Sequence, residues 1–102
     1  MPTVFQKQVW KSLSKIPRGM VSTYGEIAKV LGKPGAARVV GNACNANPFA
    51  PKVPCHRVVA SDGRIGGYAH GSRKKIGLLK KEGIRVKNGK IADFERKIWR
   101  FG

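Results

Sequence analysis

The sequence contains few acidic residues: 5 Asp and Glu among 102, against 21 Lys and Arg. The formal net charge is therefore +16 at pH 7. In a compact fold these positive side chains repel one another unless a polyanion neutralises them. This favours nucleic acid as the partner, because bound phosphates release their counterions. An anionic membrane and a basic surface without a partner are the alternatives.

The chain also lacks a long hydrophobic run, a secretory signal and a lipidation motif, so nothing in the sequence supports the membrane alternative. It has two cysteines, Cys44 and Cys55, and no CxxC pair, so we expect no zinc site. A disulfide between them stays open, although the missing secretory signal favours free thiols in a reducing cytoplasm. With 102 residues and neither repeat nor linker, we expect one domain over residues 1–102.

Two stretches begin with the spacing of a capping box, in which a hydroxyl residue and a Glu or Gln three positions later bond each other's backbone N–H. These pairs are Thr3 with Gln6 and Thr23 with Glu26. Gly32 is well placed to end the second helix. Hydrophobic residues at near-helical spacing follow the first box: Phe5, Val9, Leu13 and Ile16.

After a short turn, a third helix is expected from Ala36 to about Asn45, and its small residues would allow close approach of another backbone. A helix, a tight turn and a second helix are typical of a helix-turn-helix unit. Further on, residues 58–60 and 64–65 read as a hairpin around Ser61-Asp62-Gly63, and a helix is expected over residues 72–82. Asn88-Gly89 predicts another hairpin between Val86 and Ile91. Asp93 is expected to cap a last helix. The predicted fold is mostly α with short β-hairpins, a winged helix-turn-helix-like single domain.

One segment could carry covalent chemistry. Cys55 is preceded by Pro54 and followed by His56, between two apolar runs. Cysteine reacts as the thiolate, which a neighbouring base or cation favours. The residues alone leave two interpretations open: Cys55 is a nucleophile, or it is an inert buried cysteine.

The run Pro54-Cys55-His56-Arg57-Val58 resembles the active-site motif of the O6-alkylguanine-DNA alkyltransferases. Further segments fall in that family's order and spacing up to about Gly83: residues 5–10, 21–24, 36–41, 47–48, 66 with 68, and 78–79 with 82. The resemblance implies single-turnover DNA repair, in which an alkyl group passes from guanine O6 to the thiol of Cys55. It corresponds to the family's C-terminal DNA-binding and active-site domain, without the N-terminal domain that many members carry.

The resemblance assigns catalytic roles residue by residue. Cys55 would attack the alkyl carbon, and its proton would leave through a water to His56, which Glu82 orients. Tyr24 would donate a hydrogen bond to guanine N3. The alternatives are a packing role for Tyr24 and a helix-end charge for Glu82.

Four further positions match the family's DNA-binding residues. Arg38 would fill the hole left by the flipped base, although a phosphate contact alone is the alternative. Asn47 would brace the turn after the recognition helix, or simply end that helix before Pro48. Tyr68 resembles the aromatic wall of the base pocket. Ala69 replaces a common serine whose backbone N–H contacts guanine O6.

The expected partner is double-stranded DNA containing O6-alkylguanine, bound in the minor groove by a cytoplasmic, nucleoid-associated monomer without a cofactor. Two other functions are compatible with parts of the sequence. The tail from Arg85 to Gly102 resembles the short alkyltransferase-like proteins, which sense such lesions without repairing them and lack the cysteine. The other alternative is a regulator that binds a specific DNA sequence. The predicted recognition helix has only Arg38 and Asn42 as side chains that could contact base edges.

Overall fold

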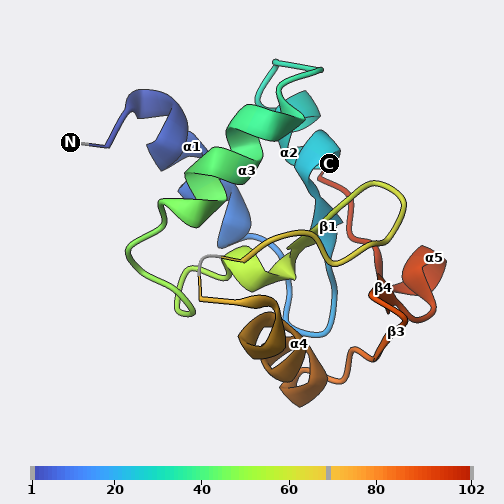
Figure 1. Cartoon of the computed structure of the whole chain (residues 1–102). Helices are drawn as coiled ribbons and strands as arrows, with labels where there is room; N and C mark the ends of the chain where they lie inside the picture. The colour runs from blue at the N-terminus through green and yellow to red at the C-terminus, as the bar shows by residue number, and fades with distance from the viewer. Residues whose placement is uncertain (1, 69, 102) are drawn as a thin grey trace.

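The computed structural model describes residues 2–68 and 70–101. Five helices and two small sheets follow one another along the chain (Figure 1). In order they are α1 (Val4–Leu13), β1 (Ser22–Thr23), α2 (Tyr24–Val30), α3 (Ala37–Asn45), the 3-10 turn η1 (Cys55–Arg57), β2 (Val58–Val59), α4 (Ser72–Lys81), β3 (Val86–Lys87), β4 (Lys90–Ile91) and α5 (Phe94–Lys97).

Helices α1, α2 and α3 enclose the first hydrophobic core. The capping box that starts α1 is complete, because the Thr3 hydroxyl accepts from the Gln6 N–H at 3.0 Å and the Gln6 amide oxygen accepts from the Thr3 N–H at 2.9 Å. The buried Trp10 indole donates to the Ala43 carbonyl at 2.8 Å, which ties α1 to α3. Ile16 is buried in the turn that follows α1 rather than in the helix itself.

The predicted helix-turn-helix unit is formed by α2 and α3, which pack on each other. The Thr23 hydroxyl caps α2 by accepting from the Glu26 N–H at 3.0 Å. The reciprocal half of this capping box was predicted wrongly: the Glu26 carboxylate lies 3.7 Å from the Arg100 guanidinium. Gly32 has φ +75° immediately after α2, so it ends the helix as predicted.

The sheet that follows the thiol segment differs from the prediction. Val58 and Val59 do not form a hairpin with residues 64–65; they pair in parallel with Ser22 and Thr23. A turn does join Ala60 to Arg64, whose carbonyl accepts from the Ala60 N–H at 2.8 Å. Val58 and Val59 pair with β1 rather than with residues 64–65 because both are fully buried between the two halves of the domain, where β1 supplies the backbone partners.

The predicted hairpin around Asn88-Gly89 is confirmed, with Val86 opposite Ile91. Asn88 and Gly89 have φ of 52° and 77°, as a two-residue turn of this kind needs. The short helix α5 follows, but Asp93 does not cap it through its side chain. Its backbone adopts a left-handed conformation with φ 56°, which directs the carboxylate away from the helix N–H groups.

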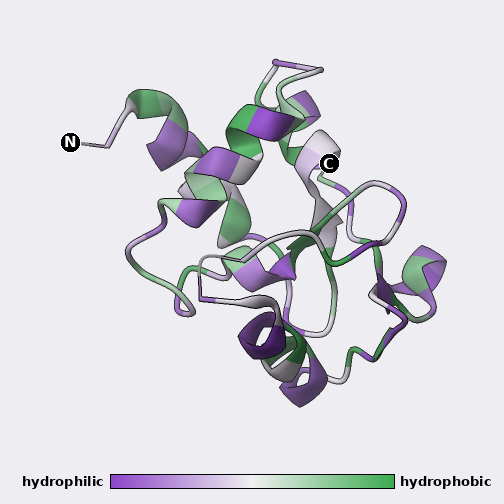
Figure 2. Ribbon diagram, in the orientation of Figure 1, coloured by the Kyte–Doolittle hydropathy of each residue, from purple (hydrophilic) through white to green (hydrophobic). Residues whose placement is uncertain are grey.

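The second hydrophobic core lies between α4, the β3–β4 hairpin and the strands β1 and β2. Its buried members are Val21, Val59, Ile65, Leu79, Ile84 and Ile91. Figure 2 shows α4 as predominantly hydrophilic, so only a narrow stripe of this helix faces the core. The mostly α fold class with a helix-turn-helix is confirmed, with one hairpin and one parallel pair in place of two hairpins. Over residues 2–68 and 70–101, no helix has the length and apolar character needed to cross a membrane.

Candidate active site and nucleic-acid interface

The Cys55 thiol lies in the 3-10 turn η1, directly before β2. Pro54 precedes the turn, and the Cys55 N–H donates to the Val53 carbonyl at 2.9 Å. Cys55 is 4% exposed and packs in the first core. Because β2 pairs with β1 and β1 leads directly into α2, the thiol is held in a fixed position relative to the helix-turn-helix.

A chain of polar contacts begins at His56, the residue after Cys55. The His56 Nε2 donates to a Glu82 carboxylate oxygen at 3.1 Å. The Arg57 guanidinium donates to both Glu82 oxygens, at 2.9 and 2.7 Å, and to the Ile16 carbonyl at 2.8 Å. A bidentate guanidinium fixes the carboxylate plane, so Glu82 holds the imidazole in one orientation.

The protonation states suit a base. Burial lowers the pKa of His56 even though Glu82 opposes the effect, so the imidazole is neutral at pH 7. Burial alone would raise the pKa of Glu82, but the hydrogen bonds and charges of Arg57 and His56 outweigh it and lower that pKa. With Nε2 donating to Glu82, Nδ1 is the acceptor nitrogen. It is buried, and no atom of residues 2–68 or 70–101 bonds it. The imidazole can therefore accept a proton there.

The second cysteine has a different environment. Cys44 is buried on α3, and burial raises its pKa to about 12, so it stays a neutral thiol at physiological pH. Both cysteines are free thiols. In the described part of the chain, no three His, Cys, Asp or Glu side chains gather where they could bind a metal.

Tyr24 stands at the start of α2, beside the loop that follows β2. Its hydroxyl donates to the Gly67 carbonyl at 3.5 Å, and burial raises its pKa to about 12, so it remains a donor. Gly66, with φ +69°, allows this approach, since a Cβ there would lie 2.9 Å from the Tyr24 hydroxyl oxygen.

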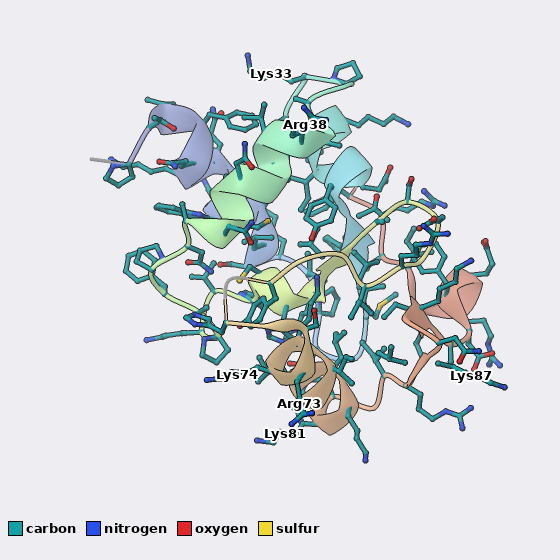
Figure 3. The ribbon with its side chains drawn as sticks, viewed as in Figure 1. Lys33, Arg38, Arg73, Lys74, Lys81 and Lys87 are labelled. Carbon is teal, nitrogen blue, oxygen red and sulfur yellow. The ribbon has the colours of Figure 1, made fainter. Side chains whose placement is uncertain are left out.

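Arg38 is exposed near the start of α3. Together with Tyr24 and Gly67 it lines a cavity of about 380 Å³. Figure 3 shows Arg38 near Lys33 at one end of the molecule. The small residues Ala37 and Gly41 line the same cavity. The structure therefore brings Arg38 and Tyr24 together, on either side of an opening large enough for a planar ring.

Asn47 joins α3 to the thiol segment. Its side chain is buried, donates to the Val53 carbonyl at 2.8 Å and accepts from the Phe49 N–H at 3.0 Å. Both bonds fix the loop that enters the thiol turn. The structure thus gives Asn47 a bracing position next to Cys55.

Tyr68 is half-buried, with its ring 5.4 Å from that of His70 in an edge-to-face arrangement. Burial and the neighbouring Cys55 thiol raise the pKa of Tyr68 to about 12. Tyr68 packs against the first core, of which Cys55 is a member. Ala69, the remaining predicted contact, lies outside the described residues.

Comparison with known proteins identifies the family. Residues 4–84 match a family model described as 6-O-methylguanine DNA methyltransferase, DNA binding domain. The chain belongs to this family.

Curated members of the methyltransferase family match most of this chain but are longer. The methylated-DNA–protein-cysteine methyltransferase of Shigella flexneri is 52% identical over 81 residues, which cover 79% of this chain and 47% of the relative. That of Methanosarcina acetivorans is 56% identical, covering 79% and 52%. The chain thus spans about half the length of these relatives.

Two solved structures are similar. The Mycobacterium tuberculosis OGT in complex with DNA has a TM-score of 0.78 and 50% identity, covering 80% of this chain and 51% of that one. The S. pombe protein Atl1, in complex with damaged DNA containing O6-carboxymethylguanine, has a TM-score of 0.85 and 32% identity. This second match covers 99% of this chain and 100% of that one, so it includes the tail beyond residue 84.

One residue of the candidate site was not predicted from the sequence. Lys75 is fully buried, and its Nζ donates to the carbonyls of Val58 (2.7 Å), Ile65 and Gly67 (3.1 Å). It thereby fixes the loop on which Tyr24 rests. The available signal was a lysine four residues before Leu79, on the inward face of α4, where an apolar residue is expected.

Proposed function

We propose that this chain repairs DNA by transferring the alkyl group of O6-alkylguanine to the thiol of Cys55, once per molecule. It would correspond to the C-terminal, DNA-binding and active-site domain of the longer methyltransferases. The observation that carries the proposal is a buried thiol, Cys55, directly followed by a buried His56 whose Nε2 donates to Glu82 and whose Nδ1 is unbonded within the described residues. Tyr68 packs against the core cluster that contains Cys55.

The transfer step follows from these groups. The Cys55 sulfur attacks the alkyl carbon, the carbon–oxygen bond to guanine O6 breaks, and a thioether forms. The thiol proton passes through a water to the Nδ1 of His56, which Glu82 stabilises as an imidazolium. The thioether has no leaving group, so the protein is consumed in the reaction.

The departing guanine gains negative charge, and a hydrogen bond to it lowers the barrier. Tyr24 donates a hydrogen bond from its hydroxyl to guanine N3 in this proposal. The proton that His56 received from the thiol passes through solvent to the guanine anion, so the base leaves neutral and the imidazole is neutral again. Tyr68 forms the wall of the base pocket, and the backbone of Ala69 contacts O6. The base must leave the helix to reach Cys55, and Arg38 fills the space it leaves.

The proposed partner is a duplex bound through its minor groove by a protein monomer, in the nucleoid of the cell. Support comes from α3, where Ala37 and Gly41 leave room for a backbone to approach Arg38 and the cavity. The charge of +16 favours phosphate contacts of any sequence.

A second candidate is a sensor that binds alkylated guanine without repairing it. The similarity to Atl1 over the whole chain favours it. The proposal of repair rests on Cys55, since the resemblance to the short alkyltransferase-like proteins implies a different residue between the proline and the histidine.

The test is intact mass after incubation with a duplex containing O6-methylguanine. We expect the protein to gain one methylene, the Cys44→Ala variant to gain it equally, and Cys55→Ala to gain none while still binding the duplex. If the wild-type mass stays unchanged while the lesion is bound, the chain is a sensor. Modification mapped to Cys44 would overturn the mechanism.

A further inference from the structure

The positive charge of this chain lies mostly away from the recognition helix. Helix α3 contains one basic residue, Arg38. Figure 3 shows a separate group of cations on α4, with Arg73, Lys74 and Lys81 at the opposite end of the molecule from Arg38 and Lys33. The charge on α4 therefore needs a partner other than the groove that α3 enters.

Beside α4 the surface is hollowed into a second basic site. A cavity of about 400 Å³ borders the candidate active site, since His56 is part of its lining. Its charged lining is four cations and one carboxylate from four separate segments: Arg18, Lys52, Arg57, Lys81 and Glu82. Arg57 neutralises Glu82 through its bidentate bond. The remaining three cations thus give this cavity a strong positive potential.

The fold fixes one of these cations and aligns two others. Arg18 donates to the Lys81 carbonyl at 2.9 Å, which fixes its guanidinium at the edge of the cavity. Lys74 lies seven residues before Lys81 and Leu78 between them, so all three share one face of α4. Lys74 extends the line of charge beyond the cavity, along the helix.

We propose that this face, the α4 basic surface formed by Arg18, Lys52, Lys74 and Lys81, binds the phosphate backbone of a second DNA segment while α3 engages the first. The inference goes beyond the proposed function, because it concerns a segment without a lesion. Because the cations extend further than one phosphate group could reach, they match a chain of phosphodiesters better than they match a single small anion. A membrane surface would need exposed aromatic or aliphatic side chains among the cations, and Leu78 is half-buried.

The test uses the full chain with two short lesion-free duplexes carrying different dyes, both in excess over protein. Two-colour coincidence measures bridging, and native mass spectrometry gives the composition of the complex. The cavity variant combines Lys52→Gln, Lys74→Gln and Lys81→Gln. The matched control removes three exposed lysines elsewhere, with Lys7→Gln, Lys11→Gln and Lys90→Gln.

We expect one protein to hold two duplexes at low salt. The cavity variant should lose the second duplex by about tenfold or more, and the salt slope of that binding should fall by about 2 to 3, since each phosphate contact contributes about 0.9. The control variant should bind the second duplex within about twofold of wild type. Lys74→Gln alone should weaken it measurably, which keeps the test valid if the triple variant melts early.

Several results would overturn the inference. They are saturation at one duplex per protein, complexes that contain two proteins, an equal loss in both triple variants, and an equal loss of the first duplex in the cavity variant. A final arm adds inorganic phosphate at constant ionic strength. Loss of the second duplex at submillimolar phosphate would make the cavity a site for a free anion rather than for DNA.

Discussion

Lys75 gives the sharpest test of how this fold holds its active-site loop. Its ammonium group is fully buried, and burial lowers its pKa from 10.5 to about 8, against the opposing effect of the Cys44 and Cys55 thiols. Between pH 8 and 10.5 the unfolded chain therefore binds one more proton at this side chain than the folded protein does. Stability must rise with pH over that interval.

The size of this effect follows from the same values. Each pH unit in the interval is worth about 1.4 kcal/mol, so Lys75 adds about 3 kcal/mol to the free energy of unfolding between pH 7 and 10.5. Lys75→Met removes this term. It also removes a donor from three carbonyls, of which that of Gly67 keeps the Tyr24 hydroxyl, at a cost of about 1 to 3 kcal/mol for each one left unpaired. This cost is the same at each pH. The informative quantity is therefore the change with pH and not the value at one pH.

The assay is urea denaturation of wild type and Lys75→Met at several pH values from 7 to 10.5. The Tyr24 hydroxyl, with its pKa raised to about 12, lowers stability at high pH equally in both proteins. The Cys44 thiol does not, because the Lys75 charge opposes the burial that raises the pKa of Cys44, so both proteins carry Cys44→Ala. We expect the stability of wild type minus that of the variant to increase by about 3 kcal/mol across the range. A difference that stays constant with pH would show that Lys75 keeps its ordinary pKa, and the reasoning would fail.

Three further substitutions test the site. Asn47→Ala removes the acceptor of the Phe49 N–H and one of the two donors to the Val53 carbonyl, which still accepts from the Cys55 N–H. It should lower the free energy of unfolding by about 1 to 3 kcal/mol in urea, and a loss below about 0.5 kcal/mol would mean that water replaces both bonds. Gly66→Ala forces a Cβ to within 2.9 Å of the Tyr24 hydroxyl, so single-turnover transfer should slow, whereas Gly77→Ala, on α4 and with open space at its Cβ, should react as wild type does; equal rates for the two variants would contradict this. Arg38→Ala should slow transfer from a duplex far more than from the free base O6-benzylguanine, since only the duplex has a hole to fill; equal slowing of both substrates would assign Arg38 a structural role.

Local signals predicted most helix boundaries. Thr3 begins α1, Thr23 caps α2, and Asn88-Gly89 forms the predicted turn, because each depends on bonds between residues close together in sequence. The wrong predictions came where a distant partner competes. Val58 and Val59 pair with a strand about 36 positions earlier, and no local pattern encodes that choice.

The same distinction applies to the site. Pro54-Cys55-His56 could be singled out from the sequence, since its chemistry lies in adjacent residues. The contacts of Arg57 with Glu82 and with the Ile16 carbonyl join three separate segments, and they appear only once the chain is folded. Lys75 was missed for a related reason: a buried lysine is tolerable only where carbonyls converge, and those of Val58, Ile65 and Gly67 come from other parts of the chain.

The parallel pair of β1 and β2 has a consequence for how the protein opens. Each strand has two residues, too few to persist alone, so the pair exists only while both the helix-turn-helix and the thiol turn are docked. Opening of either half would break the pair and release the other. The amides of residues 22–23 and 58–59 should therefore exchange with deuterium at one common rate, that of global unfolding. The helix-turn-helix and the turn that holds Cys55 would then form a single cooperative unit, with no partly open state in which one is folded without the other.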